Sequence, residues 1–410
     1  MNNEAHADTT RQRRGAVSLL LAMVLLGVFP LDVLLPSFPA LAEHFRSTPA
    51  DIALSISLFA VGIAFAQLLI GPLSDVTGRK GLLLAGMGVS MLGALGCAMT
   101  ADYTLFLAFR LLQAVGCGCF VLSQALVQDL FEGEERDRLR ILMVTATGIF
   151  ISVSPLAGTF LQATLGWRGS FWVFTALAAV VLIKAWFFLD NSRPSKRSTP
   201  LTFLNAYRRV MGDFEFVGYW LISAFAFACH FSFIVISPLI FMEQLHLSAY
   251  EFSLILLVYG AAYIVGGIAA ALLSRRISSA QQIIAGLSLI LLAGLVMLFL
   301  SQHFALSPAT VLIPMLICTA GTTIARPAAT SRAMSLFPEN AGTSASAGST
   351  IIFICGGLIS ALISLSPSNL QTTLGYCFVL LSGIALALNK RIGHRARVLD
   401  NSAIAPTNGD

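Results

Sequence analysis

Apolar residues along this 410-residue chain gather into stretches of about twenty, separated by short polar breaks. A helix rises ~1.5 Å per residue, so about 20 apolar residues cross the ~30 Å hydrocarbon core of a bilayer. The chain lacks the ten-residue polar/apolar alternation of membrane strands, and helices satisfy their own backbone hydrogen bonds in lipid. The pattern predicts transmembrane helices at residues 16–37, 52–71, 82–100, 104–127, 141–163, 169–189, 215–240, 250–273, 282–300, 308–330, 342–364 and 372–389.

The composition indicates a membrane protein and excludes a soluble one. Hydrophobic residues make up 57% of the chain and charged residues only 11%. A soluble domain carries roughly 25% charged residues, so this chain cannot build a water-exposed surface over its whole length. The expected fold class is therefore an all-α integral membrane protein with twelve transmembrane helices.

The N-terminus has a feature that resembles a cleaved signal peptide. Basic residues at 11–14 precede the first apolar run, and Ala40-Leu41-Ala42 resembles a signal-peptidase site. The run is too long for a signal h-region, contains Asp32, and leads into many further spans. We therefore interpret it as an uncleaved first transmembrane helix.

The positions of the positive charges predict the topology. If both termini are cytoplasmic, 21 of the 25 lysines and arginines fall on the cytoplasmic side, and only Arg46 and Arg168 fall outside. Cytoplasmic loops of membrane proteins carry an excess of such residues. We therefore expect a multi-pass protein of the bacterial inner membrane with both termini in the cytoplasm. The net charge of +5 then follows from topology and needs no nucleic-acid partner.

The longest connection divides the predicted helices into two sets of six. Residues 190–213 contain Pro194, Pro200 and several basic residues, a composition typical of a linker. We expect an N-terminal six-helix bundle at 1–189, a cytoplasmic linker at 190–213 and a C-terminal six-helix bundle at 214–410.

A short polar loop between the second and third predicted spans combines glycines, an acid and two bases. Residues 71–80 read GPLSDVTGRK, and the glycines allow a tight turn that holds the charges together. The loop resembles the signature loop of the major facilitator superfamily, in which it locks the two halves of the transporter on the cytoplasmic side. Its gate residues are Gly71, Asp75, Gly78, Arg79 and Lys80.

Two charged residues lie inside predicted spans at similar depth. A buried arginine costs ~2.5 kcal/mol or more, so Arg110 needs an acid or a watery cavity. Asp32 is the only acid well inside an apolar stretch. Asp32 lies ~24 Å along the first helix and Arg110 ~9 Å along the fourth, which places both in the outer half of a ~30 Å core. We expect them to meet in one cavity and to couple transport to protons; a static ion pair that orders the helices is the alternative.

Further segments resemble one subfamily of drug:proton antiporters. The spacing Arg110-x-x-Gln113-x-x-Gly116 matches a second superfamily signature, which is associated with proton coupling. The segments that resemble the bicyclomycin and chloramphenicol resistance (Bcr/CflA) subfamily are residues 29–39 (FPLDVLLPSFP), 166–168 (GWR), 237–238 (SP) and 341–348 (AGTSASAG). The resemblance implies two six-helix bundles around a central cavity, with repeats nested in each half.

The resemblance also implies contacts for the cytoplasmic gate. Asp75 is expected to face the N-terminus of the eleventh helix near Gly342, where the helix dipole favours an anion. Arg79 is expected to pair with Asp129 at the inner end of the fourth helix. Such a latch must break and re-form during transport.

The fifth predicted helix departs from the antiporter pattern. Gly148, Pro155 and Gly158 are present, whereas Ser154 and Thr159 stand where antiporters of this family usually have glycines. Small residues still permit close helix contact, so we expect the packing role to survive. The altered motif weakens the distinction between antiport and symport and leaves proton-coupled uptake as an alternative.

Other polar residues inside the spans are candidates for a substrate cavity. His230, Tyr259 and Tyr263 lie in the seventh and eighth helices, where the histidine could join a proton relay, contact a substrate, or bond a neighbouring carbonyl. Arg326 either faces the cavity, where a second arginine would favour an anionic substrate, or snorkels to the cytoplasmic surface. Three glutamines could line the cavity or satisfy local hydrogen bonds between helices: Gln67, Gln113 and Gln124.

The motifs of other function classes are missing from the sequence. It has no phosphate-binding loop, nucleophile elbow or zinc motif, and its seven cysteines lie in apolar runs without metal-ligand spacing. We expect no enzyme, metal or cofactor, and the proton gradient as the driving force. A membrane enzyme needs grouped catalytic residues and a channel needs no alternating latch, so neither is favoured.

The expected function is proton-coupled efflux of small drug-like molecules by a monomer in the lipid bilayer. The alternative is a dedicated exporter of one endogenous metabolite, such as a carboxylate siderophore, a peptide or an amino acid. An apolar cavity with few charges serves either class of substrate, so the composition does not separate them.

Overall fold

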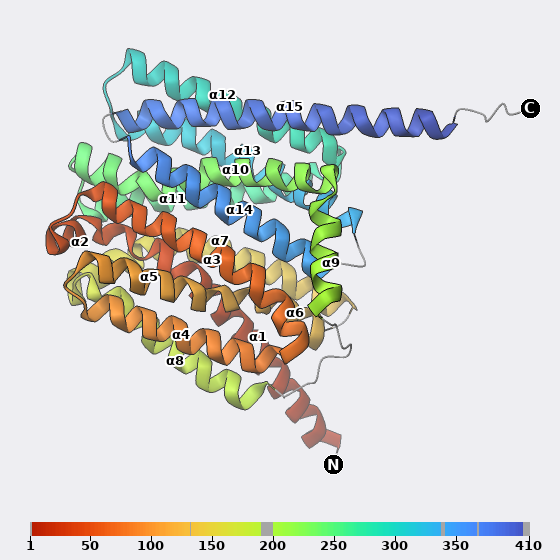
Figure 1. Ribbon diagram of the computed structural model, residues 1–410. Coiled ribbons are helices and arrows are strands. Elements are labelled where there is room, and N and C mark those ends of the chain that lie inside the picture. The colour runs from red at the N-terminus through yellow and green to blue at the C-terminus, as the bar shows by residue number, and fades with distance from the viewer. Residues whose placement is uncertain (1, 132, 190–199, 338–340, 367–368, 405–410) are drawn as a thin grey trace, which may run out of the picture.

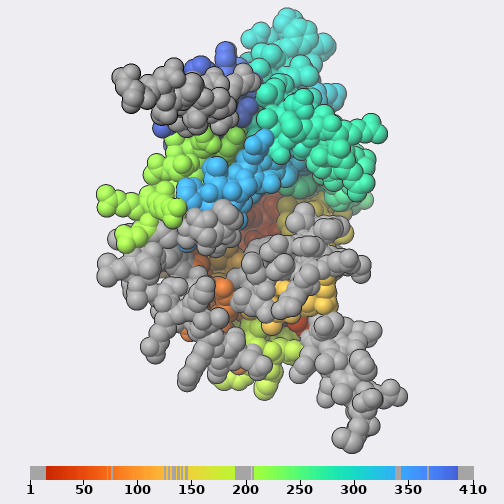
Figure 2. Space-filling model, turned by 90° about the vertical axis from the view of Figure 1, so that its right-hand side faces the viewer, coloured from red at the N-terminus to blue at the C-terminus, as the bar shows by residue number. Residues whose placement is uncertain are grey.

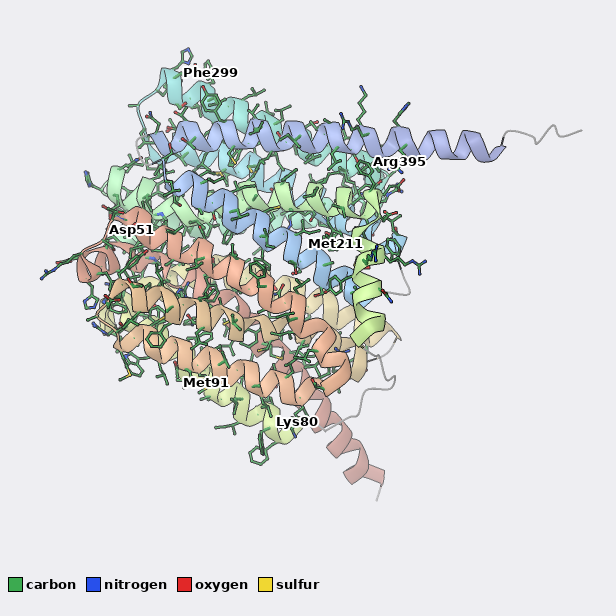
Figure 3. The ribbon with its side chains drawn as sticks, in the orientation of Figure 1. Asp51, Lys80, Met91, Met211, Phe299 and Arg395 are labelled. Atoms are coloured by element: carbon green, nitrogen blue, oxygen red, sulfur yellow. The ribbon has the colours of Figure 1, made fainter. Side chains whose placement is uncertain are left out.

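The computed structural model describes residues 2–131, 133–189, 200–337, 341–366 and 369–404, and every regular element in these ranges is helical. Twelve helical segments of the described chain are long and apolar enough to cross a membrane, which confirms the predicted twelve-helix fold. Figure 1 shows the long helices side by side, with both chain termini at the same end of the bundle. We call this end the basic end and the opposite one the far end; Lys80 and Arg395 mark the first, and Asp51 and Phe299 the second (Figure 3).

The first six spans lie within residues 15–188. Two of them, the first and the fourth, are interrupted by a short 3₁₀ helix. The elements are α1 (Asn2–Asp32), η1 (Leu35–Ser37), α2 (Phe38–Phe45), α3 (Pro49–Thr77), α4 (Arg79–Met99), α5 (Tyr103–Cys117), η2 (Gly118–Val121), α6 (Leu122–Leu130), α7 (Gly133–Leu165) and α8 (Arg168–Phe188).

A short helix outside the spans, α9 (Pro200–Met211), precedes the second set of six. The seventh span ends in a short π-helix, η3. The elements are α10 (Phe214–Pro238), η3 (Leu239–Gln244), α11 (Ala249–Leu273), α12 (Ser279–His303), α13 (Pro308–Leu336), α14 (Ala341–Ser364) and α15 (Leu370–Ile404). We refer to α1–α8 as the first half and to α10–α15 as the second half.

Polar residues at the turns determine where several spans begin. Thr48 accepts a hydrogen bond from the Asp51 amide, and the Asp51 carboxylate accepts one from the Thr48 amide in return. Ser248 and Glu251 form the same reciprocal pair at the start of α11. Each satisfies amide groups that the first turn of a helix leaves without partners, a contribution of about 1 kcal/mol per cap.

The first span is not the single helix that its hydropathy predicts. Because Pro36 has no N–H group, it cannot bond the Asp32 carbonyl four residues earlier, and α1 ends at Asp32. The chain passes through η1 and returns to a helix at Phe38, so that the span extends to Phe45 rather than to residue 37. The break leaves the carbonyl groups of the last turn of α1 open to other partners.

The fourth span is broken where its neighbours approach most closely. A Cβ atom at Gly116 would collide with the backbone of Ser90 in α4, and one at Gly118 would collide with Ala66 in α3. Glycines at these positions let three helices meet backbone to backbone. The predicted single helix is therefore α5, the turn η2 and α6, which ends at Leu130.

The two halves meet along two helix pairs, α3 with α14 and α7 with α11. In the first pair, the hydroxyls of Ser57 and Ser360 are 2.8 Å apart, and both side chains are buried. Closer to the basic end, Ser349 donates to the side-chain oxygen of Gln67 at 2.6 Å. Gln67 therefore has a structural partner across the interface between the halves.

Helix α9 packs against α10 and α14 of the second half and reaches α3 of the first half through Tyr207, and Figure 1 shows it crossing the ends of the long helices at the basic end. The Tyr207 hydroxyl donates to the Ser346 hydroxyl of α14 at 2.9 Å and lies 3.4 Å from the Leu68 carbonyl of α3. Burial raises the pKa of Tyr207, and the bond to Ser346 partly offsets this, so the hydroxyl stays a donor at neutral pH.

Candidate functional site

Arg110 lies in the middle of the first half with none of its surface exposed. One terminal nitrogen donates to the Gln113 side-chain oxygen at 2.9 Å, and the other donates to the Pro30 carbonyl of α1 at 3.2 Å. The guanidinium carbon lies 4.2 Å from the centre of the Phe59 ring. Its Nε atom is buried and makes no hydrogen bond.

The break in the first span explains why a backbone carbonyl holds Arg110. Pro30 lies in the last turn of α1, at the negative end of the helix dipole. In this turn the Phe29 carbonyl bonds the Val33 amide, whereas the Pro30 carbonyl accepts from Arg110. Burying an arginine costs about 2.5–3.5 kcal/mol on insertion scales, whereas a hydrogen bond from a charged group contributes about 1.5–3 kcal/mol. Two such bonds offset the burial of Arg110 without an acidic partner.

Asp32 is the last residue of α1 and is 8% exposed. The expected meeting of Asp32 with Arg110 is not found as an ion pair: among the described residues, Arg110 bonds to Gln113 and to the Pro30 carbonyl instead. The sequence does not indicate this partner, because the acceptor is the backbone carbonyl of Pro30 and every residue carries such a carbonyl. Arg110 nevertheless binds the last turn of α1, which is the turn that ends at Asp32.

The Asp32 carboxyl lies three residues before η1, which contacts α10 and α11 of the second half. It lies close enough to the Tyr259 hydroxyl of α11 to interact with it electrostatically. Tyr259 is 1% exposed and hydrogen-bonds to Nδ1 of His230 in α10. The rings of His230 and Tyr263 are 5.4 Å apart between centres. His230, Tyr259 and Tyr263 thus form one cluster of polar side chains in the second half.

Arg326 of α13 is held against an aromatic side chain of α10. Its guanidinium carbon lies 4.8 Å from the centre of the Phe227 ring, and it interacts electrostatically with His230. The side chain is half-buried, and its Nε atom is buried without a hydrogen-bond partner. Of the two alternatives for Arg326, this geometry favours an inward-facing residue over one that snorkels to the surface.

Gln113 and Gln124 are two of the residues that the sequence predicts for the cavity. Gln113 is 1% exposed and accepts the hydrogen bond from Arg110, so it orients that arginine. The side chain of Gln124 lies outside the described part of the structure. Phe59 and Phe227, which cover the two guanidinium groups, gave no signal in the sequence because they lie in uniformly apolar stretches.

The predicted gate loop is mostly helical, because residues 71–77 continue α3 and only Gly78 separates α3 from α4 at the basic end. Gly78 has a φ of 94°, in the region that only glycine adopts readily, and it ends α3 and begins α4. Arg79 donates to the Ser74 hydroxyl at 2.6 Å, and Lys80 lies 5.8 Å from the Trp186 ring centre. A Cβ atom at Gly71 would be 3.2 Å from the Ser346 hydroxyl of α14, so the last turns of α3 lie against the second half.

The expected latch partners fall outside the described side chains. Asp75 and Asp129 lie in helices whose backbone is described, but their side chains are not, and the same holds for the surroundings of Gly342. The contacts of Asp75 with α14 and of Arg79 with Asp129 therefore stay predictions.

The antiporter-motif residues of α7 lie where this helix meets α1 and α11. The Pro155 carbonyl accepts hydrogen bonds from Thr159 and from Ser253 of α11, both at 3.1 Å. A Cβ atom at Gly158 would collide with the Val33 carbonyl, next to Asp32. At Gly148 the nearest atom to such a Cβ would belong to Ile264, at 3.5 Å, which is an ordinary contact.

The two motif glycines are expected to respond differently to alanine. Gly158→Ala would force α7 away from the end of α1 and lower the free energy of unfolding by about 1–3 kcal/mol, as overpacking does. Gly148→Ala, the matched control on the same helix, has room and should behave as wild type. Thermal unfolding of the purified variants in detergent measures both; equal midpoints for the two would contradict the close approach of α7 and α1.

Comparisons with known proteins agree with this architecture. A sequence model of the Major Facilitator Superfamily matches residues 18–361. The uncharacterised MFS-type transporter YdgK of Bacillus subtilis (strain 168) is 28% identical over 267 residues, which cover 64% of this chain and 66% of that protein. The multidrug resistance protein MdtL is 26% identical over 235 residues in Salmonella heidelberg (strain SL476) and 25% identical over 236 residues in Escherichia coli O139:H28 (strain E24377A / ETEC).

The two MdtL matches each cover 57% of this chain and 60% of the relative, so the chain spans less than two thirds of the length of the curated relatives it matches. The superfamily match is longer, since it begins in the first span and ends in the eleventh. Together with the twelve candidate membrane spans of the described chain, this match shows that the protein is a multi-pass membrane protein and that it belongs to the Major Facilitator Superfamily.

Proposed function

We propose that this protein is a proton-coupled efflux transporter of small drug-like molecules, of the Bcr/CflA type, which works as a monomer in a bacterial inner membrane. The observation that carries the proposal is Asp32: a buried carboxyl, without an ion pair among the described residues, that lies three residues before η1, the segment through which the first half contacts α10 and α11. An unpaired carboxylate in a membrane interior is costly, and a bound proton removes the charge. The proton gradient would drive the cycle without a cofactor.

The orientation in the membrane follows from the positive charges. The loop after α3, the helix α9 and both termini lie at the basic end, which Figure 2 views face on. Lys80, Arg208, Arg209 and Arg395 belong to segments at this end. Under the positive-inside rule, the basic end is the cytoplasmic one, and both termini are cytoplasmic.

The interface between the halves supports a mechanism in which the halves rock against each other. At the far end, η1 and α3 of the first half contact α10, and η1 also contacts α11. Hydrogen bonds such as Ser57–Ser360 and Thr159–Ser253 join the halves there through single small side chains. Such contacts can separate and re-form without moving large groups, which alternating access requires.

Arg110 has a positioning role in this mechanism. It binds the last turn of α1 through the Pro30 carbonyl, so it ties the location of Asp32 to that of α5. The two charges near this turn belong to Asp32 and Arg110, and protonation of Asp32 removes the negative one. The free energy of placing the turn in apolar surroundings then becomes lower. A change in proton occupancy can thereby favour one arrangement of the halves over the other.

The names of the relatives support efflux in general terms. MdtL is named a multidrug resistance protein, whereas the name of YdgK states only that it is an MFS-type transporter. A dedicated exporter of one metabolite stays as a second candidate because Arg326 provides a fixed positive charge that a narrow class of substrates would use.

Transport in everted membrane vesicles tests the proposal. Vesicles with and without the protein are energised, and the pH gradient is followed while unrelated lipophilic drugs and single metabolites are added. Partial loss of the gradient with several drugs is the expected result. A response to one metabolite alone would replace the multidrug proposal with the dedicated exporter, and no response to any compound would reject proton-coupled efflux.

A further inference from the structure

The interior of this protein holds more fixed positive than negative charge. Asp32 is the only acidic residue that is buried among the described residues, whereas Arg110 is fully buried and Arg326 is half-buried. Arg110 donates to Gln113 and to the Pro30 carbonyl, so its charge is already satisfied. Arg326 makes no hydrogen bond with the described residues, although its Nε atom is buried. One internal cation is therefore left to a group that is not part of the protein.

The two terminal nitrogens of Arg326 make no hydrogen bond with the described residues, whereas its Nε atom is buried. The ring of Phe227 covers the guanidinium at 4.8 Å, a cation–π arrangement that fixes the plane of the group. A guanidinium held by its face can still donate two parallel hydrogen bonds from its edge to a carboxylate or sulfonate. His230, the nearest titratable neighbour from α10, already bonds to Tyr259 and does not compete for that edge.

Aromatic rings extend from this arginine along α10 and α14. Phe227 stacks on Phe231 with ring centres 5.2 Å apart, and Phe353 of α14 meets Phe227 edge-on at 5.5 Å. Tyr263 of α11 lies on the other side of His230 and is half-buried. This neighbourhood suits a planar apolar body attached to an anionic head group.

We propose that the transported substrates include amphipathic organic anions, whose carboxylate or sulfonate binds Arg326 while an aromatic body lies among the neighbouring aromatic side chains. This inference rests on the proposed transport function and names its substrate class. A lipophilic cation would meet Arg326 as a like charge, and only Asp32 could attract it. A neutral molecule would leave the open donors of Arg326 unpaired.

Binding to the purified full-length protein in detergent tests this proposal without any proton gradient. The probes are naphthalenesulfonate, which stays ionised, its neutral analogue naphthalenesulfonamide, and the cation tetraphenylphosphonium. Binding is measured as the rise in the thermal unfolding midpoint on titration, because a ligand of the folded state stabilises it. The sulfonate should bind more tightly than the sulfonamide by about tenfold or more, the effect of one charge-assisted hydrogen bond.

Substitutions in α13 test whether sulfonate binding depends on Arg326. Arg326→Gln should weaken sulfonate binding by roughly ten- to hundredfold and leave the sulfonamide unaffected, and Arg326→Lys should fall between. Arg332→Gln, which removes an exposed arginine of the same helix, should bind as wild type. Equal affinity for sulfonate and sulfonamide in the wild type, unchanged sulfonate binding in Arg326→Gln, or binding of tetraphenylphosphonium alone would each overturn the proposal.

The two proposals fail in different experiments. Sulfonate binding through Arg326, with no proton flux in vesicles for any compound, would reject proton coupling and retain the substrate class. Drug-dependent proton flux, with no sulfonate binding in detergent, would reject the substrate class and retain proton-coupled efflux.

Discussion

Asp32→Asn is expected to reduce substrate-dependent proton flux to the level of vesicles that lack the protein. Asparagine has nearly the same shape as aspartate, but it can neither bind nor release a proton. Because Asp32 is the only buried acid among the described residues, no other described carboxyl lies within the interior to replace it. The uncharged side chain also removes the cost of an unpaired charge, so the variant should fold as well as wild type.

Two measurements separate loss of coupling from loss of function. Proton flux is followed in everted vesicles, and exchange of labelled for unlabelled substrate is followed in proteoliposomes without a gradient. Asp32→Asn should lose the first and retain the second, since exchange needs no net proton movement. Glu43→Gln, an exposed carboxyl of α2, is the matched control and should keep both. Full proton-coupled transport by Asp32→Asn would remove the central argument for the mechanism.

The number and approximate limits of the spans could be predicted from the sequence because lipid imposes them. Each crossing must supply about 20 apolar residues, and every backbone group must find a partner within the protein. Hydropathy does not report interruptions, however. The break after Asp32 depends on the missing N–H of Pro36, and the break at Gly118 lies where Ala66 of another helix leaves no room for a side chain.

Only the charged residues of the candidate site could be predicted from the sequence, because charged residues are rare in apolar spans. Asp32 and Arg110 were identified because charged residues are rare in spans, but their partners were not. The partner of Arg110 is a backbone carbonyl, which every residue has, and the residue that covers Arg326 is one of 29 phenylalanines. Such partners are determined by which helix faces meet, and a single apolar stretch does not encode that choice.

The contact between Ser57 and Ser360 offers a direct test of alternating access. The two residues are 303 positions apart, come from different halves, and have hydroxyl oxygens 2.8 Å apart. Ser57 lies in the first third of α3 and Ser360 near the end of α14, so both are closer to the far end of the bundle. If a substrate leaves through the far end, these two helices must separate at this point in each cycle.

The double variant Ser57→Cys/Ser360→Cys is expected to transport normally when reduced and to stop when oxidised. Cysteine sulfurs in place of hydroxyls 2.8 Å apart are within reach of a ~2.05 Å disulfide after a small rotation of the side chains. The bond would hold α3 against α14, so that the far end stays closed and transport falls to the level of empty vesicles. Substrate binding from the basic end should survive, because that end is not cross-linked.

Reversal by reductant distinguishes a locked transporter from a damaged one. The native cysteines all carry free thiols, so each single variant, Ser57→Cys and Ser360→Cys, must be oxidised in parallel and should keep its activity. Cross-linking is read from a mobility shift on a gel after cleavage in the connection between the halves. Full transport by a completely cross-linked protein would mean that α3 and α14 do not part at Ser57, and a rocking motion of the two halves about this interface would then be excluded.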